Sequence, residues 1–532
     1  MDALTRLQER EGWLSEESLR KLAARLGMPL HRLESVSTFY THFRRTPPRR
    51  LQVDVCRDLA CSLAGGDAAC AQLREALASR DDVEINPVSC LGRCDRAPAA
   101  AMGHRVLDTR DTEAAARAIE SQAAPAATRS PARWEADPYA DAAEHYSALR
   151  DALSQEASGV VAGLEDAGLR GMGGAGFPTA RKWSLVAAEP SSPKHVVCNA
   201  DESEPGAFKD REILHDLPHL VIEGMALAGF CTGSARGLVF IRREYGPERL
   251  RLEAALEAAR AAGALGRNVF GTGFAFEIDV FVSPGGYILG EETALLECLE
   301  DRRGEPRNKP PFPGQRGLHG RPTLVNNVET FAHAAAITRR GAAWWKGLGR
   351  RGRSGHKFIS VSGDVARPGV VLVPFGATLG ELLEICGGMR DGAEPAAVAP
   401  GGASSNFLPA DRLDVPIDFD SLSDAGSMLG SGAAVFIAAG RDLLEVGLNV
   451  ARFFRNESCG KCVPCRLGTE KAVKLVEGGG PAGARALTPE DLAKLAQLDA
   501  TLRATSLCGL GQVALGPLRS LLERFPRAVA GP

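Results

Sequence analysis

Three cysteines with two residues between neighbours most strongly constrain what this chain can fold into. They are Cys459, Cys462 and Cys465, and a lone Cys508 follows well downstream. Four thiolates at this spacing can surround a metal centre, because three come from one tight turn and the fourth from a distant segment. The pattern favours a [4Fe–4S] cluster. Structural zinc is the alternative, although zinc motifs usually pair two Cys-x2-Cys turns.

A second set of four cysteines lies near the N-terminus. It consists of the pairs Cys56-x4-Cys61 and Cys90-x3-Cys94. Each pair follows a predicted strand, so one loop can present two sulfurs to one metal site. The x4 gap resembles the first ligand pair of plant-type [2Fe–2S] proteins, whereas the x3 gap departs from that pattern. A [2Fe–2S] cluster is favoured, with zinc or two unrelated buried pairs as alternatives.

Cysteine usage and charge exclude several classes of protein. The chain has 13 cysteines, an odd number, and begins without an apolar export signal, so we expect reduced thiols in a cytoplasmic protein. The net charge of −3 comes without blocks of like charge, and no apolar run approaches the length of a membrane helix. We expect neither nucleic-acid binding nor a direct membrane span. The remaining cysteines are expected to pack in the interior: Cys70, Cys198, Cys231, Cys298 and Cys386.

The 532 residues predict an α/β multidomain chain. Helical patterning at the N-terminus precedes short alternating segments that are typical of strands. An Ala/Pro/Ser-rich stretch is typical of a linker, and the region after Leu443 is helical in pattern. The predicted limits are 1–119 for a first α/β unit, 120–150 for the linker, 151–347 for a larger glycine-rich α/β unit, 348–441 for a β-rich unit and 442–532 for a helical unit.

A glycine-rich segment from Gly171 to Gly176 matches G-x-G-x-x-G. A dinucleotide fingerprint follows a strand, whereas the residues before Gly171 are typical of a helix that ends in a turn. The segment therefore argues against a standard Rossmann fingerprint. Closely spaced glycines still let backbone N–H groups approach a phosphate, and Arg181 and Lys182 add positive charge. A purely structural glycine loop is the alternative.

Carboxylate and amide side chains follow two predicted strands. Residues 199–206 (NADESEPG) come after Val196-Val197, and residues 287–293 (YILGEET) come after the strand that includes Val280. Strand ends in α/β sheets are where ligands bind, and these side chains are suited to ribose hydroxyls or an isoalloxazine ring. Asn326-Asn327 adds an amide pair. Each segment alone is also typical of a solvated turn.

These segments together resemble the flavin-bearing, NADH-binding subunit of respiratory complex I and its relatives. Residues 7–45 and the N-terminal cysteine set resemble the thioredoxin-like [2Fe–2S] subunit of the same enzymes. The resemblance implies a thioredoxin-like [2Fe–2S] domain, a Rossmann-like FMN/NADH domain, a β-grasp domain of the SLBB type and a C-terminal helical bundle with [4Fe–4S]. The segments that carry it are Gly171–Trp183, Asn199–Asp210, Tyr287–Thr293, Lys309–Pro313, Asn326–Thr330, Glu457–Arg466 and Ser506–Gly511.

The resemblance also implies a set of residues for each cofactor. FMN would be held by Gly171, Gly173, Gly174, Lys182, Asn199, Asp201, Glu202, Tyr287, Gly290, Glu291, Asn326 and Asn327. NAD(H), the substrate, would contact Phe177, Glu204, Glu292, Lys309 and Phe312. The [4Fe–4S] cluster would take Cys459, Cys462, Cys465 and Cys508, and the [2Fe–2S] cluster Cys56, Cys61, Cys90 and Cys94. Hydride transfer needs no general acid or base, although Glu202 and Glu292 would lie beside it. The sequence departs from the family at Met172, where many members carry arginine, and at Leu185, where some carry an aromatic residue.

The expected function is that of a diaphorase. FMN can exchange a hydride with NAD(H) and pass single electrons to clusters, so it belongs between the two. Complex I usually keeps the two resembling units on separate subunits. Their fusion resembles the diaphorase chains of NAD-dependent molybdenum- or tungsten-containing formate dehydrogenases and of NAD-reducing hydrogenases. Residues 341–353 and 400–416 look most like the formate dehydrogenase β subunits.

That resemblance implies NAD+ reduction with electrons from a formate-oxidising α subunit, with further small subunits as additional partners. The alternatives are the diaphorase subunit of an NAD-reducing hydrogenase, the NADH-binding subunit of complex I, a zinc-stabilised nucleotide-binding scaffold and a free-standing NAD-dependent dehydrogenase.

Overall fold

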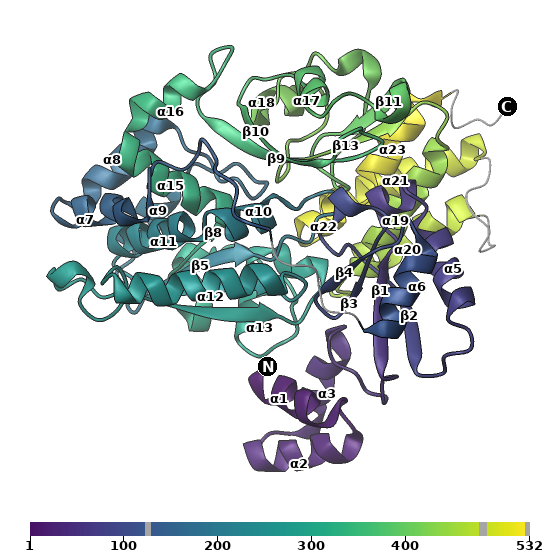
Figure 1. Ribbon diagram of the computed structural model, residues 1–532, viewed down its shortest axis with the longest axis horizontal. Coiled ribbons are helices and arrows are strands. Elements are labelled where there is room, and N and C mark those ends of the chain that lie inside the picture. The colour runs from purple at the N-terminus through teal and green to yellow at the C-terminus, as the bar shows by residue number, and fades with distance from the viewer. Residues whose placement is uncertain (123–128, 478–486, 527–532) are drawn as a thin grey trace.

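The computed structural model describes residues 1–122, 129–477 and 487–526. It contains three sheets with their helices, an N-terminal group of three helices at the bottom of Figure 1 and a C-terminal helical group at the right. Part of the predicted linker, residues 123–128, lies outside the described residues, and the predicted unit limits stay predictions. Within the described ranges, no helix is both long and apolar enough to cross a membrane.

Helices and a four-stranded sheet form the N-terminal part. Ser15 caps α2 by accepting a hydrogen bond from the N–H of Ser18 at 3.0 Å. The first sheet has the order β2-β1-β3-β4, with β1 and β2 parallel. The sequence did not predict β3, because Ala-Ala-Ala-Met lacks polar/apolar alternation. The elements are α1 Asp2–Glu11, α2 Glu16–Leu26, α3 Leu30–Phe39, β1 Leu51–Cys56, α4 Leu59–Leu63, α5 Gly66–Ala76, β2 Val83–Val88, β3 Ala99–Met102, β4 Arg105–Asp108 and α6 Thr112–Ser121.

The second sheet is fully parallel, with the order β7-β6-β5-β8. Helix α11 packs against this sheet and against neighbouring helices, and nearly all of its residues are buried. This agrees with parallel α/β sheets, whose faces are covered by helices. From β5 the chain extends to β6 and β7 on one side and returns to β8 on the other. The ends of β5 and β8 thus form a topological switch point, where such sheets bind ligands. The elements are α7 Ser147–Leu153, α8 Ala157–Ala167, α9 Thr179–Ala188, β5 His195–Ala200, α10 Lys209–Asp216, α11 Pro218–Thr232, β6 Arg236–Arg242, α12 Gly246–Ala261, β7 Glu277–Ser283, the 3-10 turn η4 Tyr287–Gly290, α13 Glu292–Leu299, α14 Pro313–Arg316, β8 Thr323–Asn327, α15 Val328–Arg340 and α16 Ala342–Leu348.

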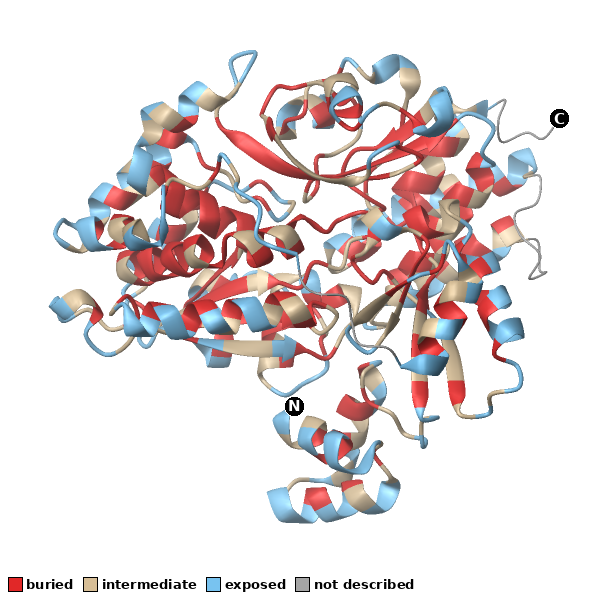
Figure 2. Ribbon diagram, in the orientation of Figure 1, coloured by how far each residue is buried: buried red, intermediate tan, exposed pale blue. Residues whose placement is uncertain are grey.

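The third sheet is mixed, with the order β10-β9-β13-β11-β12. Its central strands β9 and β13 are largely buried, whereas the N-terminal helices expose much of their surface (Figure 2). Helices follow the third sheet, as the sequence predicts. The elements are β9 His356–Gly363, β10 Gly369–Pro374, α17 Leu379–Ile385, β11 Pro395–Ala399, β12 Leu408–Pro409, α18 Phe419–Asp424, β13 Ala433–Ala438, α19 Leu443–Glu457, α20 Val463–Glu477, α21 Pro489–Thr505, α22 Gly509–Val513 and α23 Gly516–Arg524.

A close helix crossing fixes the start of α15 beneath the switch point. A Cβ on Gly224 of α11 would lie 2.0 Å from the carbonyl oxygen of Phe331 in α15. The nearest atoms at this crossing belong to the backbone, so a change of side-chain rotamer cannot relieve the clash with an added Cβ. Since α15 begins directly after Asn327, the crossing determines where the end of β8 lies.

We expect Gly224→Ala to lower the free energy of unfolding by about 3 kcal/mol, because the two helices must separate. The matched control is Gly163→Ala in α8, where an added Cβ meets nothing within 4 Å. That change is expected to be neutral or to stabilise by up to about 1 kcal/mol through helix propensity. Melting temperatures of the full-length variants provide the measurement, and equal effects of the two changes would contradict the tight crossing.

Candidate redox site

The N-terminal cysteine set converges in one buried place. Cys56 ends β1, Cys61 lies in α4, and Cys90 and Cys94 lie between β2 and β3. All four are between 1% and 5% exposed. The Sγ atoms of Cys90 and Cys94 are 3.7 Å apart, and hydrogen bonds with Cys56 and Cys94 lower the pKa of Cys90. Four converging thiols supply the donor set of a [2Fe–2S] cluster.

The C-terminal cysteine set lines one small cavity. Cys459 and Cys462 precede α20, Cys465 lies in its first turn, and Cys508 precedes α22. All four line the cavity together with Ile288 of η4. Three thiols from one turn and one from a remote segment fit a [4Fe–4S] cluster. In the part of the chain that the structure describes, no group of three or more His, Cys, Asp or Glu side chains has the arrangement of a site for a single metal ion.

Glu457 connects both cysteine sets to the second sheet. It ends α19, next to the Cys459 turn. One carboxylate oxygen accepts a hydrogen bond from the Ser89 hydroxyl, beside Cys90, and the other accepts from the N–H of Tyr287 at 2.9 Å. One side chain therefore holds three segments that carry predicted site residues.

The glycine loop and two strand ends meet at the switch point of the second sheet. Asn199 on β5 pairs in register with Asn327 on β8. A Cβ at Gly173 would lie 2.9 Å from the Cβ of Asn327, so the loop approaches the strand end more closely than a side chain allows. The N–H of Met172 donates to the Thr330 hydroxyl at 2.9 Å. Helix α8 precedes the loop, which confirms the prediction that no strand leads into it.

Two predicted flavin residues have buried polar atoms without a protein partner. Asp201 is 5% exposed, and neither of its carboxylate oxygens makes a hydrogen bond of normal geometry within the described residues. The same holds for the Oδ1 atom of Asn326. Burial raises the pKa of Asp201 to about 7. Because unpaired buried acceptors are costly, these atoms fit a ligand that donates hydroxyl hydrogens, such as the ribityl chain of FMN.

Two predicted flavin carboxylates are occupied by protein donors. The oxygens of Glu202 accept from the N–H of Asp210 at 3.0 and 3.1 Å, and one of them accepts from the Tyr245 hydroxyl at 2.9 Å. Glu291 caps α13 by accepting from the N–H groups of Thr293 and Ala294, each at 2.9 Å. These carboxylates hold the loops in place, and their contact with flavin stays a prediction.

Asn199 and Asn327 are also held by protein atoms. The Nδ2 of Asn199 donates to the carbonyl of Gly290 at 2.9 Å. The Nδ2 of Asn327 donates to Asp210 at 2.6 Å, and its Oδ1 accepts from the Lys209 ammonium at 3.3 Å. These hydrogen bonds position both strand ends and η4 around one point. The roles of Asn199, Asn327 and Gly290 as flavin ligands stay predictions.

Glu204 joins the second sheet to the third. Its Oε2 accepts from the Tyr287 hydroxyl at 2.6 Å, and its Oε1 accepts from the N–H of Ser404 at 2.6 Å. Burial raises the pKa of Glu204 to about 7. The contact between Glu204 and the nicotinamide nucleotide stays a prediction.

Two lysines gather near Glu292. The ammonium of Lys182 donates to the carbonyl of Val325 at 3.1 Å and lies 3.9 Å from Glu292. The ammonium of Lys309 lies 3.4 Å from Glu292 and 2.8 Å from Glu291. Burial lowers the pKa of Lys182. The group combines positive charge with hydrogen-bonding oxygens, which suits the phosphates and ribose of a nucleotide.

The two aromatic residues predicted to contact NAD(H) are exposed to solvent. Phe177 is 39% exposed and Phe312 is 55% exposed. The Arg181 guanidinium lies 5.8 Å from the centre of the Phe177 ring. Leu185, where some relatives carry an aromatic residue, is 54% exposed. Exposed rings are free to stack on an adenine, and this assignment also stays a prediction.

Several residues that hold the site were absent from the predicted set. Arg242 ends β6 and Tyr245 follows it, and only that strand-end position gave a signal in the sequence. Ser404 and Glu457 bind residues that are distant in the sequence and belong to another unit of the chain. No local pattern marks such a pairing.

Family models match most of the chain in the predicted order. They are the thioredoxin-like [2Fe-2S] ferredoxin over residues 1–123, the Nuo51 FMN-binding domain over 164–336, the SLBB domain over 358–405 and the NADH-ubiquinone oxidoreductase-F iron-sulfur binding region over 445–531. The predicted fold classes and cofactors are confirmed: the chain carries an FMN-binding domain, a [2Fe–2S] domain and a [4Fe–4S] region.

Curated relatives are subunits of larger oxidoreductases. The second F-type NADH-quinone oxidoreductase subunit of Rhizobium meliloti (strain 1021) is 42% identical over 386 residues, which cover 71% of this chain and 90% of the relative. The NADP-reducing hydrogenase subunit HndC of Solidesulfovibrio fructosivorans is 40% identical over 385 residues, which cover 71% of this chain and 77% of the relative.

A solved structure covers almost the whole chain. A chain from the crystal structure of an NAD+-reducing [NiFe]-hydrogenase in the H2-reduced state superposes with a TM-score of 0.88 at 32% identity, over 99% of this chain and 92% of that chain. The N-terminal sheet therefore has a counterpart on the same polypeptide as the other parts.

Asp201 gives a testable pH dependence of FMN binding. Its folded-state pKa is raised to about 7, and the carboxylate form accepts hydroxyl donors better than the neutral acid. We therefore expect FMN affinity to be constant at alkaline pH and to fall as the pH decreases below about 7. Asp201→Asn is expected to weaken binding about tenfold at alkaline pH and to flatten the profile.

Quenching of FMN fluorescence by the deflavinated protein, measured between pH 6 and 9, provides the test. The control is Asp424→Asn, an exposed aspartate at the end of α18. An unchanged pH profile in Asp201→Asn would show that another group is responsible.

Proposed function

The chain belongs to the family of the flavin-bearing, NADH-binding F-type subunits of NADH-quinone oxidoreductase, and we propose that it reduces NAD+ with electrons from a formate-oxidising partner. It is an NAD-dependent oxidoreductase subunit with FMN and iron–sulfur clusters. Bound FMN exchanges a hydride with NAD(H) and passes electrons singly, which explains why one chain combines a nucleotide site with clusters.

The η4 turn is the observation that best supports this electron path. Ile288 lines the cavity of the C-terminal cysteine set, while its neighbour Tyr287 binds Glu204. The carbonyl of Gly290 accepts from Asn199 at the switch point. One short turn therefore borders both the predicted cubane ligands and the predicted flavin residues, which supports an electron path between neighbouring centres. Glu457 fixes the turn from the cluster side.

The formate-oxidising partner is supported by the resemblance of residues 341–353 and 400–416 to formate dehydrogenase β subunits. The second segment includes Ser404, which binds Glu204 beside the predicted nucleotide site. The molybdenum or tungsten centre would belong to the partner α subunit, and further small subunits are proposed as well. The cytoplasmic location stays a prediction.

A hydrogenase partner is the second candidate. It is favoured by the solved NAD+-reducing [NiFe]-hydrogenase, one chain of which matches 99% of this chain, including the N-terminal sheet. The F-type NADH-quinone oxidoreductase relatives instead match 69% to 72% of this chain.

The assembly purified from its native source distinguishes these partners. We expect co-purification of a molybdenum or tungsten subunit and NAD+ reduction that depends on formate. NAD+ reduction with hydrogen but not formate would replace the formate proposal with the hydrogenase one. Loss of both activities in an assembly that still oxidises NADH with an artificial acceptor would favour the complex I alternative.

Single cysteine replacements separate the two clusters. We expect Cys465→Ala to remove only the [4Fe–4S] EPR signal of the reduced protein, because the two cysteine sets share no ligand. Cys94→Ala is expected to remove only the [2Fe–2S] signal. The control is Cys386→Ala, a buried cysteine that lies outside both sets. Loss of both signals in either variant at unchanged flavin content would contradict two independent sets, and a colourless zinc-loaded protein would exclude the redox role.

A further inference from the structure

The loop that carries Cys90 and Cys94 is held by side chains from the second sheet. Arg242, the last residue of β6, is 3% exposed. Its Nη2 donates to the carbonyl of Cys90 at 2.6 Å, and its Nη1 donates to the carbonyl of Glu202. Its Nε donates to Glu244 at 3.0 Å. One buried guanidinium thus binds the backbone of a cluster ligand and the strand-end segment of the flavin domain.

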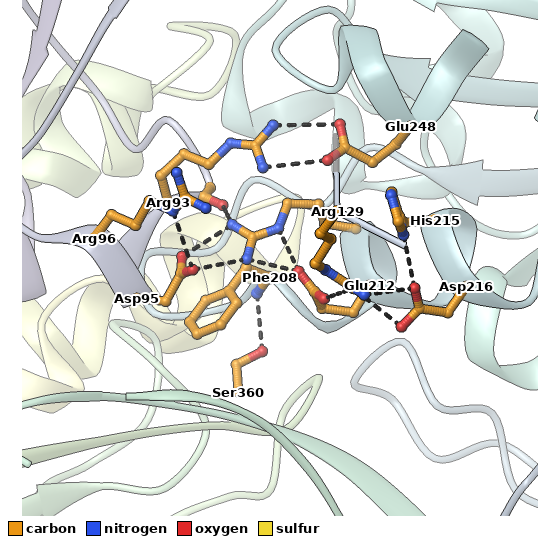
Figure 3. A network of polar contacts seen from close by, with 12 residues as sticks. Arg93, Asp95, Arg96, Arg129, Phe208, Glu212, His215, Asp216, Glu248 and Ser360 are labelled. Atoms are coloured by element: carbon orange, nitrogen blue, oxygen red, sulfur yellow. Dashed lines mark hydrogen bonds and ion pairs between the residues drawn. The ribbon is translucent and has the colours of Figure 1, made fainter. Parts of the chain in front are cut away.

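Two more arginines complete the contact between these domains. Arg211 donates to the carbonyl of Gly92 at 2.7 Å and to both oxygens of Asp95 at 3.0 and 3.1 Å. Arg93 donates to both oxygens of Glu248 at 3.2 and 3.3 Å (Figure 3). Both of these guanidinium groups therefore face a bidentate carboxylate.

Arg242 differs from these two arginines in its partners, because only its Nε faces a carboxylate and both of its Nη atoms donate to backbone carbonyls. Its guanidinium lies 5.1 Å from the centre of the Tyr245 ring, which Arg93 also approaches, at 5.7 Å. A Cβ at Gly92 would lie 3.1 Å from its Nη1, so the ligand loop approaches the charge as closely as glycine permits. Arginine stays protonated in proteins, so this charge is permanent.

We propose that the fixed positive charge of Arg242 sets the reduction potential of the cluster bound by Cys56, Cys61, Cys90 and Cys94. Reduction adds one electron, and therefore one negative charge, to the cluster. A fixed positive charge in a buried, low-dielectric place stabilises that added charge and raises the potential. Glu244 opposes this effect, because its carboxylate is paired with the same guanidinium. The inference holds whether the partner oxidises formate or hydrogen.

The test is an EPR-monitored redox titration of the [2Fe–2S] signal in the full-length, cluster-loaded protein. Arg242→Gln is expected to shift the one-electron reduction equilibrium about tenfold towards the oxidised form, or about 59 mV to lower potential. Arg242→Lys keeps the charge and is expected to remain near the wild-type potential. Glu244→Gln is expected to shift the potential in the opposite direction.

Arg243→Gln is the matched control, since it removes the same charge one position along the chain. A smaller shift in Arg243→Gln than in Arg242→Gln supports the proposal. Equal shifts in Arg242→Gln and Arg242→Lys would show that Arg242 acts only through loop geometry and would overturn it. If Arg242→Gln does not load the cluster, Glu244→Gln decides: a shift to higher potential supports the proposal, and an unchanged or lower potential refutes it.

Discussion

The arrangement of the site depends on one buried carboxylate, Glu329, which lies between two buried lysines. Its Oε2 is 2.9 Å from the ammonium of Lys209 on α10 and also contacts Lys357 on β9. The N–H of Phe358 donates to its Oε1 at 2.9 Å. Burial alone would raise the pKa of Glu329, but the two lysines hold it well below its usual range. Since a buried charge without a partner is costly, the second and third sheets stay joined at this point.

Both lysines that bind Glu329 also hold segments around the switch point. Lys209 also binds Asn327, and Asn327 packs against the glycine loop at Gly173. Lys357 donates to the carbonyl of Ser431 at 2.8 Å, which orders the loop before β13. Asn326, whose Oδ1 has no protein partner among the described residues, directly precedes Asn327 and so lies on the backbone that these contacts hold. A site that is preorganised in this way binds its ligand with a smaller ordering cost.

The sequence predicted the parts of this structure that depend on local chemistry. Cysteine spacing identified both sets, and apolar segments identified β5 and β7, because thiolate ligation and strand burial leave short-range patterns. The contacts among the units were not predictable. Glu202 shows why: its contact with flavin stays a prediction, and nothing in the sequence indicated that its carboxylate accepts from the N–H of Asp210 and from the Tyr245 hydroxyl. Whether a carboxylate faces a cofactor or the protein is decided by segments far away in sequence.

Polar contacts accompany apolar ones where the N-terminal sheet meets the flavin domain, because Phe208 also packs with Ala60, Cys90 and Cys94. Arg211 with Asp95 and Arg93 with Glu248 cross this boundary, and Glu457 of α19 joins the N-terminal sheet to the C-terminal helices through Ser89. Buried ion pairs contribute little net stability, because desolvation offsets their attraction, but they tolerate few alternative geometries. Electron transfer between centres depends on fixed separations, so this chain uses directional contacts where the relative position of its redox centres matters most.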